Sequence, residues 1–233
     1  MAANGSTLFI KQNAKIPHLA GPGSGGLAGE VADLRKDLDA ELAPIAPITV
    51  DDYQSTAPAT ADIDAILLQT ASIVAPTTYS GAGLDGVVGA LAMPYGRNIT
   101  ITTDAAGTPA DAPANCVVTG LYRGVVQVET ITVSQIAGVG TGLKPFDTVT
   151  SLAFPLSQGT GALLSVGFGA GLGVTHTPKA RSAATALPFR ELMDGGVLAI
   201  GVLTVARLWT PSTAPNAARK FALYYEYDPA IAA

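Results

Sequence analysis

Residues 97–174 consist of short segments rich in Ile, Val, Thr, Leu and Phe, separated by clusters of Gly, Pro, Asp and Asn. The segments recur at intervals of roughly a dozen residues, which is typical of an antiparallel sandwich or barrel. In the clearest segment, residues 98–103, Ile99 and Ile101 alternate with threonines as in a half-buried strand. The pattern therefore predicts a mainly β fold, an antiparallel, jelly-roll-like β-sandwich or barrel.

Further strands are expected at residues 48–50, 62–74, 116–121, 125–133, 146–154, 162–168, 197–209 and 221–227. Residues 62–74 fit a helix or a strand by periodicity alone, and the flanking Pro58 and Pro76 favour the strand. Residues 116–121 and 125–133 flank a Tyr-Arg-Gly sequence and should form a hairpin with a three-residue connection.

The remaining segments are less regular. Residues 146–154 and 162–168 should pair with each other across a connection that contains Pro and Gly. Residues 189–193 fit a turn of helix, and residues 197–209 fit one long strand. Residues 77–97, which contain several glycines, are expected to form a long irregular connection.

Residues 27–42 have a different periodicity. Apolar side chains there are spaced by four, three, four and four positions, which places them on one stripe of a helix. The stripe consists of Leu27, Val31, Leu34, Leu38 and Leu42. So short a helix is marginal in water because helix nucleation is costly. The stripe should therefore pack either on the β domain or in a helix bundle about a symmetry axis.

The first 26 residues contain one apolar group, Leu8, Phe9 and Ile10, and end in a Gly-rich hinge. This arrangement is typical of an extended arm that docks on a partner by strand addition. A merely disordered terminus is the alternative. The sequence thus predicts an extended arm at 1–26, a short amphipathic helix with a Pro-rich linker at 27–60, and a β domain at 61–233.

The composition adds an expectation of self-association. Charged residues make up 13% of the chain, about half of the roughly 25% that is usual, and the mean hydropathy is +0.36. The longest apolar run, residues 195–206, is shorter than the roughly 20 residues that span a bilayer, so no membrane span is expected. Because monomers rarely expose large apolar patches, the chain is expected to form a homo-oligomer or a lattice.

Charge and cysteine content exclude several functions. The net charge is −5 and no run of basic residues occurs, so binding to nucleic acid, which needs a cationic surface, is disfavoured. The single cysteine, Cys116, excludes an intramolecular disulfide and a multi-cysteine metal site. Its apolar, β-type neighbours predict a buried and inert thiol. The N-terminus lacks the pattern of a secretory signal, so the protein is expected to be made and kept in a cytoplasm until assembled.

No segment carries a catalytic or cofactor motif with the context that its chemistry needs. The Gly-rich residues 167–173 follow a strand, but an extended segment comes where a dinucleotide loop needs a helix, so a bend or bulge is expected. His18 and His176 lie in different loops, and no Gly-x-Ser-x-Gly elbow marks a nucleophile. His176 is expected to be a solvated loop residue. The chain is therefore expected to be no enzyme and to need no cofactor or metal.

Two groups of side chains have both a functional and a structural interpretation. The paired acids, Asp51 with Asp52 and Asp62 with Asp64, could serve a glycosidase or hold a cation, but such acids more often solvate a linker or cap a turn. The aromatic group could form a sugar-stacking platform, although core packing or interface anchoring is favoured. Its members are Trp209, Tyr224, Tyr225 and Tyr227.

Five stretches resemble, in their order, a large class of tailed-bacteriophage virion proteins. They are residues 60–62 (Thr-Ala-Asp), 94–102 (Pro-Tyr-Gly-Arg-Asn-Ile-Thr-Ile-Thr), 129–132 (Glu-Thr-Ile-Thr), 144–151 (Lys-Pro-Phe-Asp-Thr-Val-Thr-Ser) and 164–173 (Leu-Ser-Val-Gly-Phe-Gly-Ala-Gly-Leu-Gly). The resemblance covers about half of the chain. The hairpin turn at 121–124 is less polar than is usual in this class, and the arm and helix lie outside the match.

The resemblance implies a structural protein of the virion. Such proteins are β-rich, usually trimeric, and include capsid decoration or cement proteins and head fibres that carry no catalytic residues. The expected role is decoration of the outer capsid surface, with the major capsid protein and other copies of the chain as partners, most simply in a homotrimer. A head or tail fibre, or a baseplate-associated protein that contacts the host, is the alternative. The expected interaction residues are those of the arm and the helical stripe, Leu8, Phe9, Ile10, Leu27, Val31, Leu34, Leu38 and Leu42.

Overall fold

The computed structural model divides the chain into two compact units, Met1–Ile45 and Ala46–Ala233. The residues that it describes all belong to the second unit: 48–53, 57–72, 74–84, 93, 95–105, 111–157, 159–180, 185–186, 188–197 and 201–227. The predicted arm and helical stripe lie outside the described residues. The same holds for their predicted interaction residues, Leu8, Phe9, Ile10, Leu27, Val31, Leu34, Leu38 and Leu42, and for His18.

The described part of the chain is mainly β, as predicted. Its strands are β1 (Ile48–Tyr53), β2 (Asp62–Ala71), β3 (Thr77–Ser80), β4 (Arg97–Ala105), β5 (Asn115–Tyr122), β6 (Val125–Thr132), β7 (Gly138–Phe146), β8 (Thr148–Phe154), β9 (Ala162–Gly173), β10 (Thr185–Ala186), β11 (Pro188–Met193), β12 (Gly196–Val197), β13 (Val202–Thr204), β14 (Leu208–Thr210) and β15 (Phe221–Glu226), with one short 3-10 helix, η1 (Gly81–Gly83). Strand neighbours pair antiparallel in every described sheet. The predicted class, an antiparallel sandwich or barrel, is confirmed.

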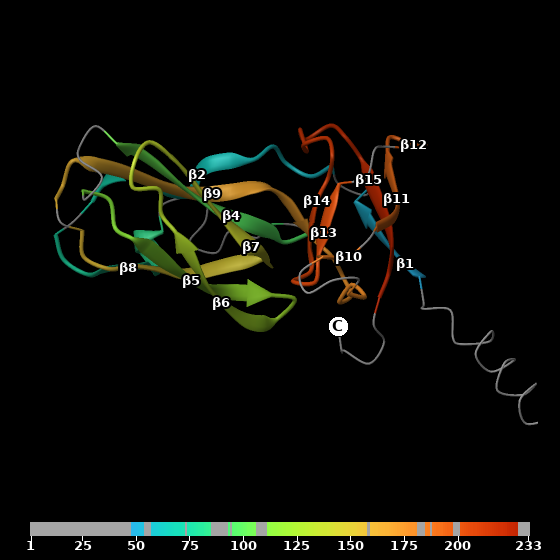
Figure 1. Ribbon diagram of the computed structural model, residues 1–233, viewed down its shortest axis with the longest axis horizontal. Helices are drawn as coiled ribbons and strands as arrows, with labels where there is room; N and C mark the ends of the chain where they lie inside the picture. Colours follow the sequence, from blue (N-terminus) through green and yellow to red (C-terminus); the bar gives the residue numbers. More distant parts are fainter. Residues whose placement is uncertain are drawn as a thin grey trace, which may run out of the picture. The chain divides into compact units, whose positions relative to one another are not determined.

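The first hydrophobic core lies between two sheets (Figure 1). One sheet contains β3, β8, β5 and β6 in that order, and the facing sheet contributes β7, β4, β9 and β2. The core is largely aliphatic: Ile99 and Ile101 of β4 are fully buried, as are Val118 of β5 and Leu152 of β8. Strands β5 and β8 alternate buried and less buried positions, so one face of their sheet packs on this core. The central strands β4 and β9 are buried at most positions, including the polar Asn98 and Thr100 of β4.

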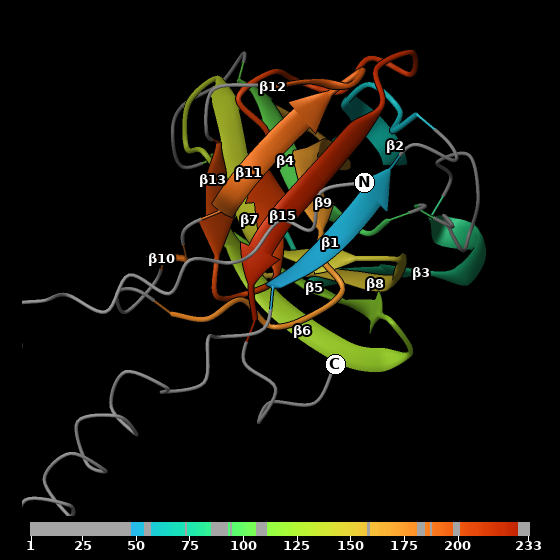
Figure 2. The same ribbon diagram turned by 90° about the vertical axis from the view of Figure 1, so that its right-hand side faces the viewer.

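A second core lies beside the C-terminal end of β9. There the sheet β1-β15-β11-β12 (Figure 2) packs with β13, β14 and the last residues of β9. This core is largely aromatic and contains Tyr53, Leu172, Val174, Leu203, Trp209, Phe221, Leu223 and Tyr225. β9 joins the two cores because its Leu164 packs in the first and its Leu172 in the second.

The glycines of β9 allow a bulge, as predicted. The register between β4 and β9 shifts between Arg97 and Ile99, opposite residues 169–171 of β9. The side-chain oxygen of Asn98 accepts a hydrogen bond from the Gly171 N–H at 2.8 Å. A Cβ atom at Gly169 or Gly171 would come within 2.7 Å of the Asn98 side chain, so only glycine fits this close approach.

The predicted β5–β6 hairpin is confirmed, but its connection is shorter than predicted. Tyr122 pairs with Val125, which leaves Arg123 and Gly124 as a two-residue loop. Both loop residues have positive φ, 52° and 77°, as a type I′ turn requires.

Three other predictions about strands are wrong. Residues 146–154 and 162–168 do not pair with each other, because β8 pairs with β3 and β5 while β9 pairs with β2, β4 and β14. Residues 189–193 form strand rather than a helical turn, since β11 pairs with β15. The predicted long strand at 197–209 is broken: Thr204 hydrogen-bonds through its side chain to the backbone of Leu208, and the chain turns back at Arg207, where φ is 67°.

The strand predicted at residues 48–50 exists and is longer, and it belongs to the β domain. β1 pairs along its whole length with β15, near the other end of the chain. β1, which precedes the predicted boundary at residue 61, therefore shares a sheet with the last strand of the β domain. Three further strands, β3, β7 and β10, occur where the sequence predicted no strand. By contrast, the strands predicted at 62–74, 98–103 and 221–227 are confirmed as β2, β4 and β15.

Candidate functional site: exposed apolar edges and faces

The described surface carries many large apolar side chains. Those that are 43% to 68% exposed are Ile48, Val50, Ile63, Leu68, Val74, Val125, Val126, Val128, Ile136, Val139, Leu143, Leu156, Val197 and Val202. Single exposed apolar residues are normal on a protein surface, but contiguous ones mark interaction sites. Their positions on the strands therefore decide whether they form contiguous interaction surfaces.

One group lies on the outer face of the sheet formed by β1, β15, β11 and β12, which faces the viewer in Figure 2. In β1, Asp51 and Tyr53 point to the core, so Ile48 and Val50 point outward. Val50 pairs with the half-buried Tyr224 of β15. Val197 of β12, at the opposite edge of this sheet, is 68% exposed. Both edges of this face therefore carry exposed apolar side chains, beside the exposed Asp52 of β1 and Arg190 of β11.

A second group lies where the edge strands β6 and β7 approach each other. The two strands end their respective sheets, and a hollow of about 510 Å³ lies between them. Val139 and Leu143 of β7 line this hollow and are more than half exposed, and Val128 of β6 lies next to it along the strand. We call this region the β6–β7 seam.

Side chains, rather than a backbone ladder, bridge the β6–β7 seam. The Glu129 carboxylate accepts hydrogen bonds from the backbone N–H groups of Leu143 at 2.6 Å and Lys144 at 3.3 Å. The Lys144 ammonium group donates to the carbonyl of Val128 at 2.8 Å. Natural edge strands usually carry outward charges that prevent pairing with other chains. Here both charged groups are turned into the seam, which leaves the outer surface of β6 apolar.

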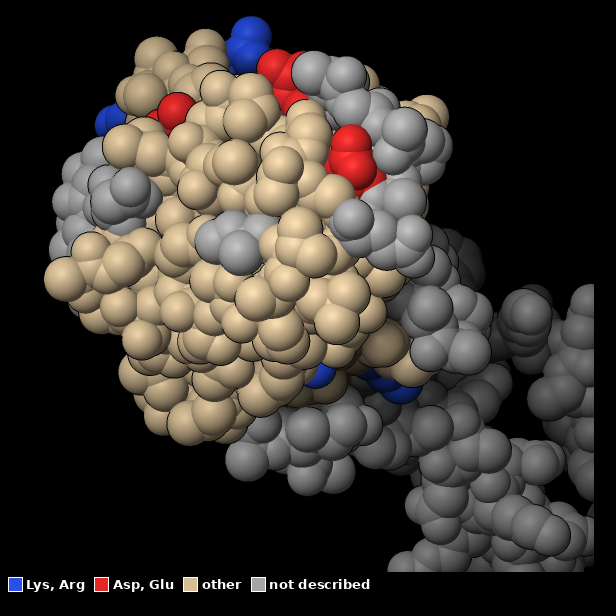
Figure 3. All heavy atoms as spheres, turned by 90° about the vertical axis from the view of Figure 1, so that its left-hand side faces the viewer, with Lys and Arg blue, Asp and Glu red and all other residues tan. Residues whose placement is uncertain are grey.

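Charged side chains are sparse on the face of the β domain that Figure 3 shows. Figure 3 shows that most described atoms there belong to uncharged residues, with lysine, arginine, aspartate and glutamate limited to a few positions near the rim. A protein that binds nucleic acid through phosphates would need clustered cations instead. Within the described ranges, the structure contains no helix long and apolar enough to cross a membrane.

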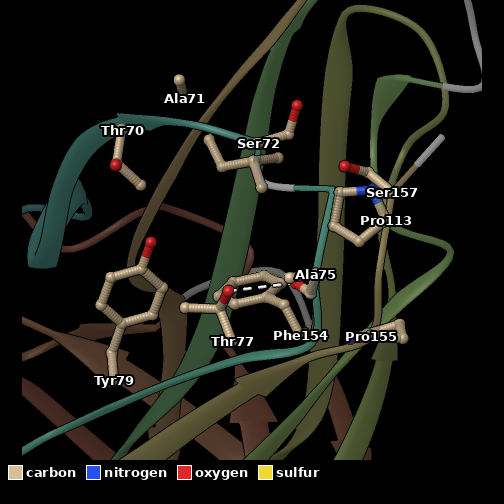
Figure 4. Close-up of a pocket in the computed structure, with 11 residues that line it drawn as sticks. Thr70, Ala71, Ser72, Ala75, Thr77, Tyr79, Pro113, Phe154, Pro155 and Ser157 are labelled. Atoms are coloured by element: carbon tan, nitrogen blue, oxygen red, sulfur yellow. Dashed lines mark hydrogen bonds between the residues drawn. The ribbon is translucent and has the colours of Figure 1, made fainter. Parts of the chain in front are cut away.

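The small pocket in Figure 4 is not a ligand site. Its volume is about 10 Å³, enough for about one water molecule. Three of its hydroxyl groups already have partners. Ser72 and Ser157 both donate to the Gly159 carbonyl, at 3.1 Å and 2.7 Å. Thr77 likewise donates to the Ala75 carbonyl at 3.1 Å. These bonds tie together the chain segments around the ends of β2, β3 and β8.

Asp51, Asp62 and Asp64, three of the acids that the sequence singled out, make hydrogen bonds within the fold. Asp51 is buried, and its carboxylate accepts hydrogen bonds from the Thr175 N–H at 2.9 Å and from the Tyr225 hydroxyl at 2.8 Å. Asp62 accepts a hydrogen bond from the Asp64 N–H at 3.3 Å, and a side-chain hydrogen bond between the two carboxyls raises the pKa of Asp64. Across the described residues, no three His, Cys, Asp or Glu side chains are placed to hold a metal ion.

The predicted aromatic group is divided by the fold. Trp209 and Tyr225 are fully buried in the second core, which confirms the packing interpretation for these two. Tyr224 is half-buried on the outer face, and Tyr227 stacks on His176 with ring centroids 4.5 Å apart. His176 is therefore a packed, half-buried residue rather than the solvated one that was predicted.

Cys116 is fully buried, as predicted, and burial raises the pKa of its thiol to about 12. A second buried group, the Glu191 carboxyl, was not predicted from the sequence. One of its oxygens accepts hydrogen bonds from the Trp209 indole N–H at 2.8 Å and from the Gly201 N–H at 2.6 Å. Its other oxygen has no hydrogen-bond partner among the described residues. Burial raises the pKa of this carboxyl.

A scan against protein-family models, a search of curated proteins and a search of solved structures found no match for the chain. The functional argument therefore depends on the residues and surfaces described above.

Proposed function

We propose that the protein is a structural component of a bacteriophage particle that decorates the outer surface of the capsid and stabilises it. The observation that carries the proposal is the set of exposed apolar side chains along the β6–β7 seam and the outer face of the β1-β15-β11-β12 sheet. Such surfaces are expected to be covered in an assembly. The resemblance of residues 60–173 to virion proteins supplies the kind of assembly.

In this role, the partners are the major capsid protein and neighbouring copies of the same chain, most simply in a homotrimer. Burial of apolar surface between neighbouring subunits stabilises the shell, because apolar surface removed from water lowers the free energy of the assembly. A stiffer shell opposes the pressure of the packed genome. The weakly charged face in Figure 3 agrees with a place outside the capsid, away from nucleic acid.

The copy number of the protein in purified particles tests the proposal. Quantitative gel densitometry against the major capsid protein should give a ratio set by the capsid lattice, with the protein present in many copies. The proposal also predicts that particles lacking the protein break at lower temperature or osmotic shock than complete particles. A protein found in only a few copies, with shells of unchanged strength, would rule out a cementing role.

A second function is contact with the host surface, as part of a head or tail fibre or a baseplate. One observation favours it: an open hollow of about 700 Å³ lined by tyrosine, aspartate and arginine side chains. A low copy number at the tail would support this alternative.

A further inference from the structure

An open hollow of about 700 Å³ lies where β1, the β5–β6 turn and the end of β9 meet. Its lining residues are Val50, Asp51, Asp52, Tyr53, Tyr95, Tyr122, Arg123, Asp147, Gly173 and Thr175. Binding sites for small molecules commonly have volumes of about 300–1,000 Å³ and a few convergent polar groups. This hollow meets both conditions.

A buried network holds the base of the hollow in place. The Tyr53 hydroxyl donates to the Gly173 carbonyl at 2.8 Å, and the Tyr122 hydroxyl donates to the Val174 carbonyl at 2.6 Å. The buried Asp51 carboxylate holds the neighbouring Thr175 through the N–H and the hydroxyl group. Burial raises the pKa of Tyr53 and Tyr122, so both phenols stay protonated as hydrogen-bond donors. A rigid base of this kind lowers the entropic cost of binding.

Two residues at the hollow have an unusual backbone conformation. Tyr95 and Arg123 have φ values of 77° and 52°, in the left-handed region that large side chains avoid. The Tyr95 carbonyl accepts a hydrogen bond from the Gly173 N–H at 2.9 Å, which ties this turn to the end of β9. Strained residues of this kind cluster at functional sites. Here the conformation places one aromatic ring and one guanidinium group at the same hollow.

The polar groups at the rim limit the chemistry of a ligand. Asp52 and the half-buried Asp147 supply carboxylates, and the Asp147 carboxylate also accepts a hydrogen bond from the Arg123 N–H. Arg123 supplies an exposed guanidinium group, which also donates to the Thr175 hydroxyl at 3.2 Å. Carboxylates only accept hydrogen bonds and guanidinium groups only donate them, whereas a hydroxyl group does both. An anionic ligand would be repelled by the carboxylates of Asp51, Asp52 and Asp147, which outnumber the single guanidinium group of Arg123. The mixture of acceptors and donors favours a ligand with hydroxyl groups, and a cationic ligand is the competing class, which titration with pentalysine distinguishes. The half-buried ring of Tyr95 adds an apolar surface.

We propose that this hollow binds a neutral saccharide, whose hydroxyl groups donate to Asp52 and Asp147 and accept from Arg123, while its C–H groups pack on Tyr95. Aromatic rings with a polar neighbour are well suited to ligands that have both polar and apolar surface. The inference does not depend on where the protein sits in a particle. Saccharide binding is measurable with the purified chain alone.

The test is a titration of the isotope-labelled full chain with maltotriose, chitotriose and lactose, followed by NMR chemical shifts. We expect at least one of these saccharides to shift resonances of residues at the hollow. In Arg123→Asn the guanidinium group is lost while the turn is kept, because Asn-Gly is a preferred type I′ sequence. This variant and Asp52→Asn should each bind at least tenfold more weakly than the parent protein.

Arg190→Asn is the matched control, since Arg190 is an exposed arginine on β11 that does not line the hollow. It should bind as the parent protein does. The proposal is overturned if none of the three saccharides shifts resonances at the hollow, or if Arg190→Asn weakens binding as much as Arg123→Asn does. Binding of pentalysine in place of saccharides, lost in Asp52→Asn, would also overturn it and assign the hollow to basic side chains of a partner.

Discussion

The two cores of the β domain are built differently. The first is aliphatic, and its members alternate along strands such as β4, with Ile99 and Ile101. Its strands also pair over long separations, since β2 pairs with β9, about 100 residues away along the chain. The second is aromatic, and it requires β1 to pair with β15, about 170 residues away along the chain. It also contains the buried carboxyls of Asp51 and Glu191 at or beside its aromatic rings. Both cores therefore need long-range strand pairing, and the second also depends on a few specific polar contacts beside its aromatic rings.

The largest expected effect is the loss of Trp209 from the second core. The Trp209 ring is fully buried, packs against Tyr53 and Phe221, and donates a hydrogen bond to Glu191. Trp209→Ala should lower the free energy of unfolding by about 3–5 kcal/mol, at or above the cost of Ile101→Ala in the first core. Urea denaturation measures both. Because β9 joins the cores, a single transition is expected, and two separate transitions would show that the cores fold independently.

Val197→Ala is the control for this comparison, since Val197 is mostly exposed. Its effect should stay within about 0.5 kcal/mol, as is usual for surface positions. A cost for Trp209→Ala as small as this would contradict the burial described for the second core.

The next effect concerns the polar contacts of the second core. Asp51→Ala removes the acceptor for the Tyr225 hydroxyl and for the Thr175 N–H. Hydrogen bonds to charged groups contribute about 1.5–3 kcal/mol each, so a loss in this range is expected from thermal or urea unfolding. The adjacent and exposed Asp52→Ala should change stability much less. Equal effects at the two positions would show that the Asp51 contacts do not hold β1 in place.

Glu191 gives the second core a dependence on pH. Its pKa is raised in the folded state, so the folded protein binds this proton more tightly than the unfolded chain does. Stability should therefore be greatest below the unfolded pKa of about 4.5 and decrease as pH rises through the folded pKa. Glu191→Gln should remove this contribution. The measurement is the difference in free energy of unfolding between parent and variant from pH 4 to pH 8, and a constant difference would disprove the expectation.

Substitutions on the exposed edge should affect assembly and leave the fold almost unchanged. Val126→Lys and Val128→Lys place charges on the outer surface of β6, where both valines are exposed. Fold stability should change within about 0.5 kcal/mol, while light scattering should show weaker self-association. Gln69→Lys, at an exposed position of β2, is the matched control. Unchanged association in both edge variants would remove β6 from the proposed interfaces.

The helical stripe is tested in the same way. If residues 27–42 hold copies of the chain together, changing Leu34 and Leu38 to serine should shift a trimer toward smaller species in light scattering. A parent protein that is a stable monomer, or an unchanged trimer in the variant, would contradict an intermolecular role for the stripe.

The sequence predicted the first core better than the second, for physical reasons. Alternation of apolar and polar residues identified β4 and the β5–β6 hairpin, because each half-buried strand has a period of two. It did not show that β8 and β9 enter different sheets, since partner choice depends on the whole sandwich. The short strands near Arg207 were missed because a side-chain hydrogen bond from Thr204 breaks the pattern.

The candidate surfaces were predicted only in general terms. The low charge content indicated exposed apolar surface, and this surface is present on β6, β7, β1 and β12. The sequence could not place it, because exposure at an edge depends on which strands end each sheet. The hollow that we propose to bind a saccharide could not be predicted from the sequence either. It brings Tyr95, Arg123 and Asp52 together from three separate segments.

The most direct test of the central claim is a cryo-electron microscopy map of the phage particle in which we propose that this protein is assembled. Our account predicts many copies on the outer capsid surface, with the β6–β7 seam and the outer face of the β1-β15-β11-β12 sheet covered by neighbouring subunits. A map that places the protein only at the tail, or that leaves both surfaces exposed to solvent on the capsid, would contradict it.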